Sequence, residues 1–237
     1  MSWELERADD EHLRVLAACW GVQPAAVVDR ARVWVQSDWP ADATGPRVVQ
    51  LADRWLTVLD APDATPAPWA HRMVGLRGLL RVPPPAPHDA ARPRGTVRQP
   101  GATDPAETRT PARQLGPADL GAVAALHARV DAADLAAAGP SPATSLLCLG
   151  SHHGEELVAV AAVVATPAGP PEVSILVDPR ARGHGLAHRL ELQLVAAAAG
   201  RWTWLQHRTI DSDRASQALA RRCGFRLVSR EHLVRPA

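Results

Sequence analysis

The chain contains no lysine, no asparagine and no tyrosine, and it has a single phenylalanine. All 26 basic residues are therefore arginines. The missing lysine excludes a Schiff-base nucleophile and the lysine of a nucleoside-triphosphate loop, and the missing tyrosine excludes a phenolic acid catalyst. The formal net charge is only +1 over 237 residues. A nearly neutral chain is not expected to hold nucleic acid through bulk positive charge.

Cysteines and long apolar segments are also scarce. The three cysteines, Cys19, Cys148 and Cys223, are far apart and form no C-x-x-C pair, so neither a disulfide framework nor a metal site is expected. The longest apolar run, residues 157–165, is far too short to cross a bilayer, and the acidic amino terminus is unlike a secretion signal. We therefore expect a cytoplasmic protein with no membrane partner.

The amino-acid composition changes along the chain. Residues 1–82 hold six of the eight tryptophans and predict a helix over 10–20, another after Pro24, and either a helix or a hairpin over 47–60. Residues 83–108 are rich in proline and poor in large apolar side chains, which predicts a linker or a long surface loop. The sequence therefore predicts a smaller Trp-rich N-terminal subdomain, a linker, and a second domain over 109–237.

The second domain shows a clearer order of elements. Apolar periodicity predicts a helix after Pro117, two strands within 145–165, a strand over 172–177, a helix from 186 to Gly200, and then strand, helix and strand over 201–234. The first of these helices is expected to bury Leu120, Val123, Ala124 and His127 on one face. This order predicts an α+β fold with a mixed, mainly antiparallel central sheet flanked by helices.

The segment DPRARGHGLAHRL, residues 178–190, places glycines and arginines where a predicted strand passes into a predicted helix. A helix amino terminus has unpaired N–H groups, and glycine lets an anion approach them closely. Arg180 and Arg182 add formal charge, so the turn is a candidate phosphate site. A dinucleotide-binding turn fits poorly, because His188 occupies its third glycine position. A glycine-rich turn with solvated arginines is the alternative interpretation.

Residues 109–237 resemble the GNAT superfamily of N-acetyltransferases, which use acetyl-coenzyme A. The resemblance rests on Arg182, Gly185 and Ala187, which match the family signature Arg/Gln-x-x-Gly-x-Gly/Ala, and on residues 211–225, which are similar to its second conserved block. It implies that the strand before the turn pairs with the pantetheine arm and that the turn holds the pyrophosphate. The cofactor-binding residues implied in this way are Leu176, Val177, Arg180, Arg182, Gly183, His184, Gly185, Leu186 and Ala187.

The resemblance further implies transfer of an acetyl group to an amine, most simply a small molecule, by direct transfer in a ternary complex. Glu172, at the start of one strand, and His207, at the end of the next, are rival general bases. The tyrosine position of the family falls on Ala220, so the departing thiolate would take its proton from water, from Ser216 or from Cys223.

The missing tyrosine also favours an alternative, a coenzyme-binding sensor or protein-interaction module without transfer activity. A third interpretation is transfer of other acyl groups, or decarboxylation. The Trp-rich front region is interpreted as a packing or dimerising subdomain, which makes a homodimer one expectation, or as a degenerate half of the same superfamily. In relatives, the segment corresponding to 130–141 shapes the acceptor site, and here it carries Asp131 and Asp134, which suit a cationic amine or serve as helix caps.

Overall fold

The computed structural model describes residues 4–19, 33–34, 47–50, 55–59, 70–82, 112–166 and 169–235. The chain divides into two compact units, the first made of Met1–Leu80, Thr166–Glu172 and Trp204–Ala237, and the second of Arg81–Ala165 and Val173–Thr203. The proline-rich segment 83–108 and the helix predicted after Pro24 lie outside the described residues. The predicted domain boundaries therefore stay a prediction.

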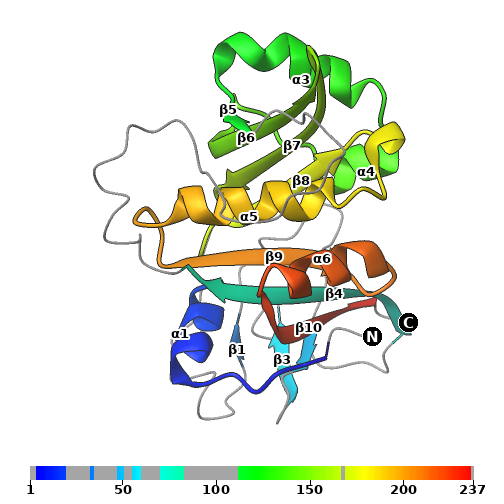
Figure 1. Ribbon diagram of the computed structural model, residues 1–237. Helices are drawn as coiled ribbons and strands as arrows, with labels where there is room; N and C mark the ends of the chain where they lie inside the picture. The colour runs from blue at the N-terminus through cyan, green and yellow to red at the C-terminus, as the bar shows by residue number, and fades with distance from the viewer. Residues whose placement is uncertain are drawn as a thin grey trace. The chain divides into compact units, whose positions relative to one another are not determined.

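The first unit is built on a sheet of strands that come from both ends of the chain (Figure 1). Its strands lie in the order β1-β3-β2-β10-β4-β9. β10 pairs antiparallel with β2 on one side and with β4 on the other. The bounds of its elements are α1 Asp10–Cys19, β1 Val33–Trp34, β2 Arg47–Gln50, β3 Trp55–Leu59, β4 Ala70–Arg81, β9 Trp204–Ile210, α6 Arg214–Arg222 and β10 Arg226–Arg235.

The structure decides between the two interpretations of residues 47–60. β2 and β3 form an antiparallel pair, so the hairpin is confirmed and the helix is wrong. The β-branched Val48 and Val49 favour a strand, and β10 supplies a second neighbour for β2. The helix predicted over 10–20 is confirmed as α1, which buries Leu13, Leu16 and Ala17.

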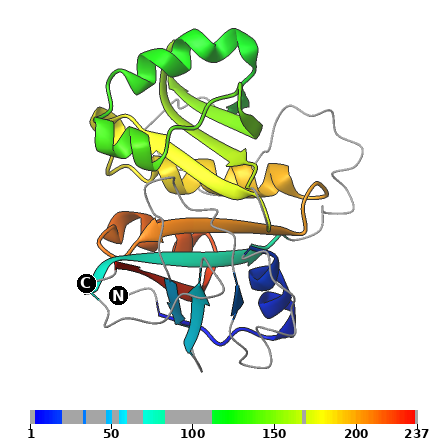
Figure 2. The same ribbon diagram turned by 180° about the vertical axis from the view of Figure 1, so that it is seen from behind.

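The second unit has a smaller sheet in the order β8-β7-β6-β5 (Figure 2). α5 packs against β6 and β7, and α3 packs against β7. The strands are β5 Arg113–Gln114, β6 Ser145–His153, β7 Glu156–Val164 and β8 Glu172–Val177, of which residues from Val173 on belong to this unit. The helices are α3 Leu120–His127, preceded by the 3₁₀ turn η2 Pro117–Asp119, α4 Ala132–Ala137, and α5 Leu186–Ala198, preceded by the 3₁₀ turn η3 Pro179–Ala181.

The core of the second unit lies between its sheet and its helices. Val123 and Leu126 of α3 and Val160 and Ala162 of β7 belong to one buried cluster. The predicted buried face of α3 is wrong in part, because Leu120 is 40% exposed and Ala124 is exposed. The buried residues of α3 are Val123 and Leu126, three positions apart, and its first residue, Leu120, directly follows a 3₁₀ turn.

The mixed α/β class with a mostly antiparallel sheet flanked by helices is confirmed in both units. The long strand β4 was not among the predicted elements. No helix among the described residues has the length and apolar character needed to span a bilayer.

Candidate cofactor and active site

The candidate phosphate turn lies between the end of β8 and the first residue of α5. Gly183 has φ +83° and Gly185, the N-cap of α5, has φ +68°, which are left-handed conformations that glycine adopts without steric cost. A Cβ atom at Gly183 would meet no other atom within 4 Å. The backbone of the turn is therefore accessible from outside.

The amides of this turn have no acceptor among the residues that the structure describes. Within the described part of the chain, no hydrogen bond joins the N–H groups of Gly183, His184, Gly185 or Leu186 to a protein acceptor. Leu186 is 6% exposed and anchors the first turn of the helix in the core. Unpaired amides at the start of a 13-residue helix form a site that suits a phosphate or pyrophosphate group.

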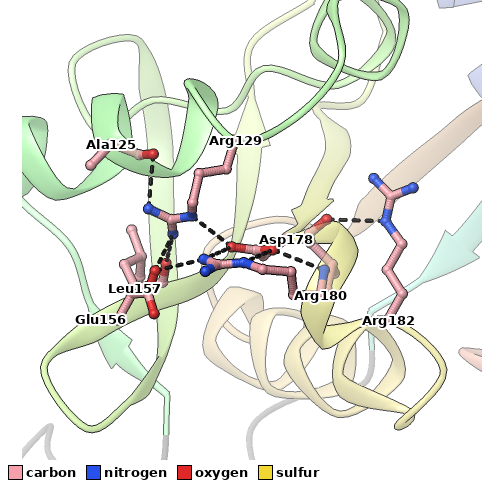
Figure 3. Close-up of polar contacts among 8 residues, drawn as sticks. Ala125, Arg129, Glu156, Leu157, Asp178, Arg180 and Arg182 are labelled. Carbon is pink, nitrogen blue, oxygen red and sulfur yellow. Dashed lines mark hydrogen bonds and ion pairs between the residues drawn. The ribbon is translucent and has the colours of Figure 1, made fainter.

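A buried carboxylate holds the chain just before the turn (Figure 3). Asp178 is 1% exposed and accepts hydrogen bonds from Arg129 Nε at 2.6 Å and from Arg180 Nη2 at 2.7 Å. It also accepts the backbone N–H of Arg180 at 2.9 Å, which caps η3. Arg180 in turn pairs with Glu156 at 2.7 Å, and Arg129 donates to the carbonyl oxygen of Leu157. Two arginines and two carboxylates thus form one neutral cluster.

The hydrogen bonds from Arg180 and Arg129 hold the pKa of Asp178 well below its usual range, in spite of its burial. The same pairing raises the pKa of Arg180. Asp178, Arg129 and Glu156 were not among the site residues predicted from the sequence. For Asp178 a signal was present, since aspartate followed by proline is typical of the N-cap and first residue of a helical turn.

The two arginines of the turn have different surroundings. Arg180 is engaged with Asp178 and Glu156 rather than with the exposed amides. Arg182 donates from Nη2 to Asp134 Oδ2 of α4 at 2.6 Å and from Nε to the carbonyl oxygen of Val177 at 3.2 Å. Figure 3 shows Arg182 apart from the Asp178 cluster. Arg180 is therefore bound to the buried Asp178 as well as to the exposed Glu156, whereas the carboxylate partner of Arg182 is exposed.

The other residues predicted to contact the cofactor differ in how far their side chains are exposed. Leu176 is buried in the core cluster, so only its backbone is offered to a ligand. His184 is exposed, and its carbonyl oxygen accepts a hydrogen bond from Arg189. Ala187 is half-buried in the first turn of α5. These residues lie on the strand end, turn and helix start on which the prediction placed them.

The three predicted catalytic residues belong to the first unit. Glu172 Oε2 accepts a hydrogen bond from Arg208 Nε at 2.6 Å, and the two side chains are 17% and 26% exposed. At the Cα level, Glu172 pairs with Gln206 in a parallel bridge between β8 and β9. The carboxylate of Glu172 is therefore held by a cation on the neighbouring strand.

His207 and Ser216 lie in direct contact. His207 Nε2 is 2.9 Å from Ser216 Oγ, and the imidazole ring packs edge-on against Phe225 with the ring centroids 5.5 Å apart. His207 is 3% exposed and Ser216 is half-buried, so the serine is the outer member of the pair. Asp213 caps α6 by accepting the N–H of Ser216. Ala220, at the tyrosine position of the family, is fully buried.

Among the described residues, no group of three or more histidines, cysteines, aspartates or glutamates is placed to hold a metal ion. The three cysteines are buried thiols. Burial raises the pKa of the Cys148 thiol to about 11, which leaves it protonated near neutral pH.

Residues 126–225 match the family described as the acetyltransferase (GNAT) family. The matched range includes β6, β7 and β8, the candidate phosphate turn, and the segment with His207 and Ser216. The predicted resemblance of the C-terminal half to this family is therefore confirmed. No curated protein matches the chain.

Several solved structures match parts of this chain at low sequence identity. A protein of Novosphingobium aromaticivorans assigned to the GNAT acetyltransferases has 20% sequence identity and a TM-score of 0.47, over 76% of this chain and 73% of that one. A GCN5-related N-acetyltransferase from Sphaerobacter thermophilus has 17% identity and a TM-score of 0.48, over 70% of this chain and 52% of that one. A GNAT acetyltransferase from Colwellia psychrerythraea has 14% identity and a TM-score of 0.46, over 70% and 57%. The present chain thus spans little more than half of the last two proteins.

Proposed function

We propose that the protein transfers the acetyl group of acetyl-coenzyme A to the amino group of a small molecule, directly and within a ternary complex. The observation that supports this most is the turn between β8 and α5, with its left-handed glycines and unpaired amides. The amides of Gly183 to Ala187 would hold the pyrophosphate, and the backbone of Leu176 and Val177 would pair with the pantetheine arm. The bound thioester supplies the acetyl group and a thiolate leaving group.

In the proposed reaction, the amine forms a new bond to the acetyl carbon, the carbon–sulfur bond breaks, one proton leaves the amine, and one proton reaches the thiolate. Glu172 and His207 stay the candidate bases for the first proton. When the proton of His207 is on Nε2, this N–H donates to Ser216 Oγ, and the hydroxyl hydrogen of Ser216 is available to another acceptor. The contact supports Ser216 as the group that protonates the thiolate.

The proposal is tested at the turn by Gly183→Ala, with Gly154→Ala as the matched control. Both glycines have positive φ and open space at the Cβ position, so both variants carry the same backbone strain of about 1 kcal/mol. Only the methyl group at Gly183 would lie in the path of the pyrophosphate. We expect Gly183→Ala to weaken coenzyme A binding by about tenfold in calorimetric titration, which is about 1.4 kcal/mol. Equal affinities for the two variants would refute the assignment of the turn.

A second candidate function is binding of coenzyme A without transfer. It is favoured by the buried Ala220 at the tyrosine position and by the complete absence of tyrosine. Release of the coenzyme A thiol, followed over a broad panel of amines, separates the two functions. Steady turnover with any amine supports the transferase, and tight binding without turnover supports the sensor.

We further propose a cytoplasmic location, which the three buried thiols support because reduced cysteines are typical of that compartment. A homodimer formed through the Trp-rich front region stays a proposal, and analytical ultracentrifugation of the full chain tests it.

A further inference from the structure

Arg182 is the first residue of the phosphate turn, and its guanidinium has two partners in the second unit. Nη2 donates to Asp134 Oδ2 at 2.6 Å, and Nε donates to the carbonyl oxygen of Val177 at 3.2 Å. Asp134 lies on α4, a six-residue helix that belongs to a different part of the chain from the turn. The contact therefore joins the candidate cofactor site to a helix of the segment 130–141.

This ion pair is solvent-exposed. The side chains of Arg182 and Asp134 are 46% and 41% exposed, and pairs of this kind are weak because water and salt screen them. Arg180 differs, because its partner Asp178 is buried and is also bound by Arg129. Arg180 is therefore fixed by the buried Asp178, whereas Arg182 is held by the exposed Asp134, which a stronger anion can replace.

A pyrophosphate on the amides of the turn would be such an anion. It carries more than one negative charge, and its oxygens suit the bidentate geometry of a guanidinium better than a single carboxylate oxygen. With the pyrophosphate in place, Asp134 would add a further negative charge beside it. Like charges at short range repel, so the contact between Arg182 and Asp134 and the bound cofactor disfavour each other.

On the basis of the proposed function, we infer that Arg182 and Asp134 form a latch that the acyl donor opens. The pyrophosphate takes over Arg182, and α4 loses its tie to the turn. The carboxylate of Asp134 is released from Arg182 only when the cofactor is bound. Asp131 caps α4 by accepting the N–H of Asp134 at 2.8 Å, so the helix keeps its own cap when the side chain of Asp134 is released.

Calorimetric titration of coenzyme A into the full chain tests the latch. Asp134→Asn removes the competing carboxylate and is expected to tighten binding about threefold. Arg182→Gln is expected to weaken it, and Asp134→Asn is expected to give no further gain in that background, because Arg182 is no longer there to be released. Asp131→Asn is the matched control, since it removes one negative charge from the same helix while asparagine still caps it.

The outcomes separate the latch from the proposed function. Failure of the unaltered chain to bind coenzyme A refutes the proposed function itself. If the unaltered chain binds but Asp134→Asn binds more weakly, then Asp134 orients Arg182 for the cofactor and the latch is wrong. An effect of Asp134→Asn no larger than that of Asp131→Asn also overturns the inference, because it would be a general effect of charge.

Hydrogen exchange gives an independent measurement. Coenzyme A is expected to speed amide exchange in residues 132–137 of the unaltered chain, and to leave exchange there unchanged in Arg182→Gln, in which the latch is already open. Slower exchange in this segment on binding, in the unaltered chain, would contradict the release of α4. Far-UV circular dichroism confirms that each variant is folded.

Discussion

At the scale of single residues, the pair His207 and Ser216 is the most informative arrangement in the first unit. The sequence predicted the two residues separately, His207 as a base and Ser216 as a proton donor. The structure brings them within 2.9 Å and buries the histidine behind the serine. The contact means that a substitution of either residue changes the hydrogen bonding of the other.

The role of Ser216 can be tested with Ser216→Ala. Positioned proton transfer is worth ~10² to 10⁴ in rate, and water replaces part of this, so we expect kcat to fall by about 10- to 100-fold. The KM for acetyl-coenzyme A should be unchanged, because the serine does not lie on the turn. Ser212→Ala, at an exposed residue before α6, is the control. An unchanged kcat in Ser216→Ala would remove the serine from the mechanism.

The carboxylate of Glu172 is bound by an arginine of the neighbouring strand. Arg208 binds its carboxylate with a charge-assisted hydrogen bond of 2.6 Å. This arginine competes with the ammonium of an acceptor for the carboxylate. The catalytic role of Glu172 stays a prediction.

At the scale of elements, Asp178 ties three pieces of the second unit together. Its side chain caps η3 by accepting the backbone N–H of Arg180. It also binds the side chain of Arg129, just beyond the end of α3, and the side chain of Arg180, which reaches Glu156 at the start of β7. The position of the turn before α5 therefore depends on one buried carboxylate. Its protonation state controls this cluster.

The pH dependence of this cluster follows from the lowered pKa of Asp178. A carboxyl with a folded pKa below its unfolded value of ~3.9 stabilises the fold above that value and loses the contribution as the pH falls towards the folded pKa. Asp119, whose pKa is about 2 because of its hydrogen bond to Arg113, acts in the same direction. Stability of the second unit should therefore decline from about pH 4 downwards.

Asp178→Asn tests the contribution of this carboxylate. Loss of the charge leaves two arginines without their shared partner, and we expect a loss of about 2 to 3 kcal/mol in the free energy of unfolding at pH 7. Chemical denaturation followed by circular dichroism measures it. The difference from the unaltered chain should shrink as the pH falls from about 4 towards 2, because the carboxyl of Asp178 then binds a proton in the unfolded chain and its contribution to stability is progressively lost. A difference that is constant from pH 7 to pH 2 would contradict this account.

Most elements of the second half could be predicted, because their apolar periodicity is regular. Leu186, Leu190 and Leu194 recur every four residues and are all buried, as α5 requires. β4 could not be predicted in the same way, because its glycines and arginines give no simple alternation. Arg77 within it is fully buried by pairing with Glu231 of β10, and such a pairing between distant segments leaves no local signal.

At the scale of the whole molecule, the first unit depends on strands from both ends of the chain. β10 has β2 on one side and β4 on the other, and both neighbours precede residue 83. The buried pair Arg77 and Glu231 joins β4 to β10, with Nε and Oε1 2.7 Å apart. The structure therefore gives the front region a role as part of the sheet that contains the final strand.

A chain that begins at Arg109 tests this dependence. Without β2 and β4, both edges of β10 are exposed and Glu231 is left without its buried arginine, which costs several kcal/mol. We expect this chain to be insoluble or to unfold without a cooperative transition. Co-expression with residues 1–108 is expected to restore soluble protein. A monomeric, cooperatively folding chain from Arg109 onwards would show that the front region is dispensable.

The candidate site could likewise be predicted only where its residues are close together in the sequence. Gly183 and Gly185 could be found from the sequence, because glycines directly before a predicted helix indicate a turn with positive φ. The partners of the arginines could not, because Asp134 and Glu156 come from α4 and β7. Charge pairing of this kind depends on the fold, and no spacing along the chain encodes it.

The pairing of β10 with β2 and β4 also has a consequence for biosynthesis. The ribosome releases β2 and β4 early, whereas their shared neighbour is among the last strands to emerge. All segments of the second unit are translated in the interval, so that unit can fold first while the early strands wait with open hydrogen-bonding edges. While these strands are exposed during translation, a nascent chain of this protein is most accessible to chaperones and most prone to aggregation.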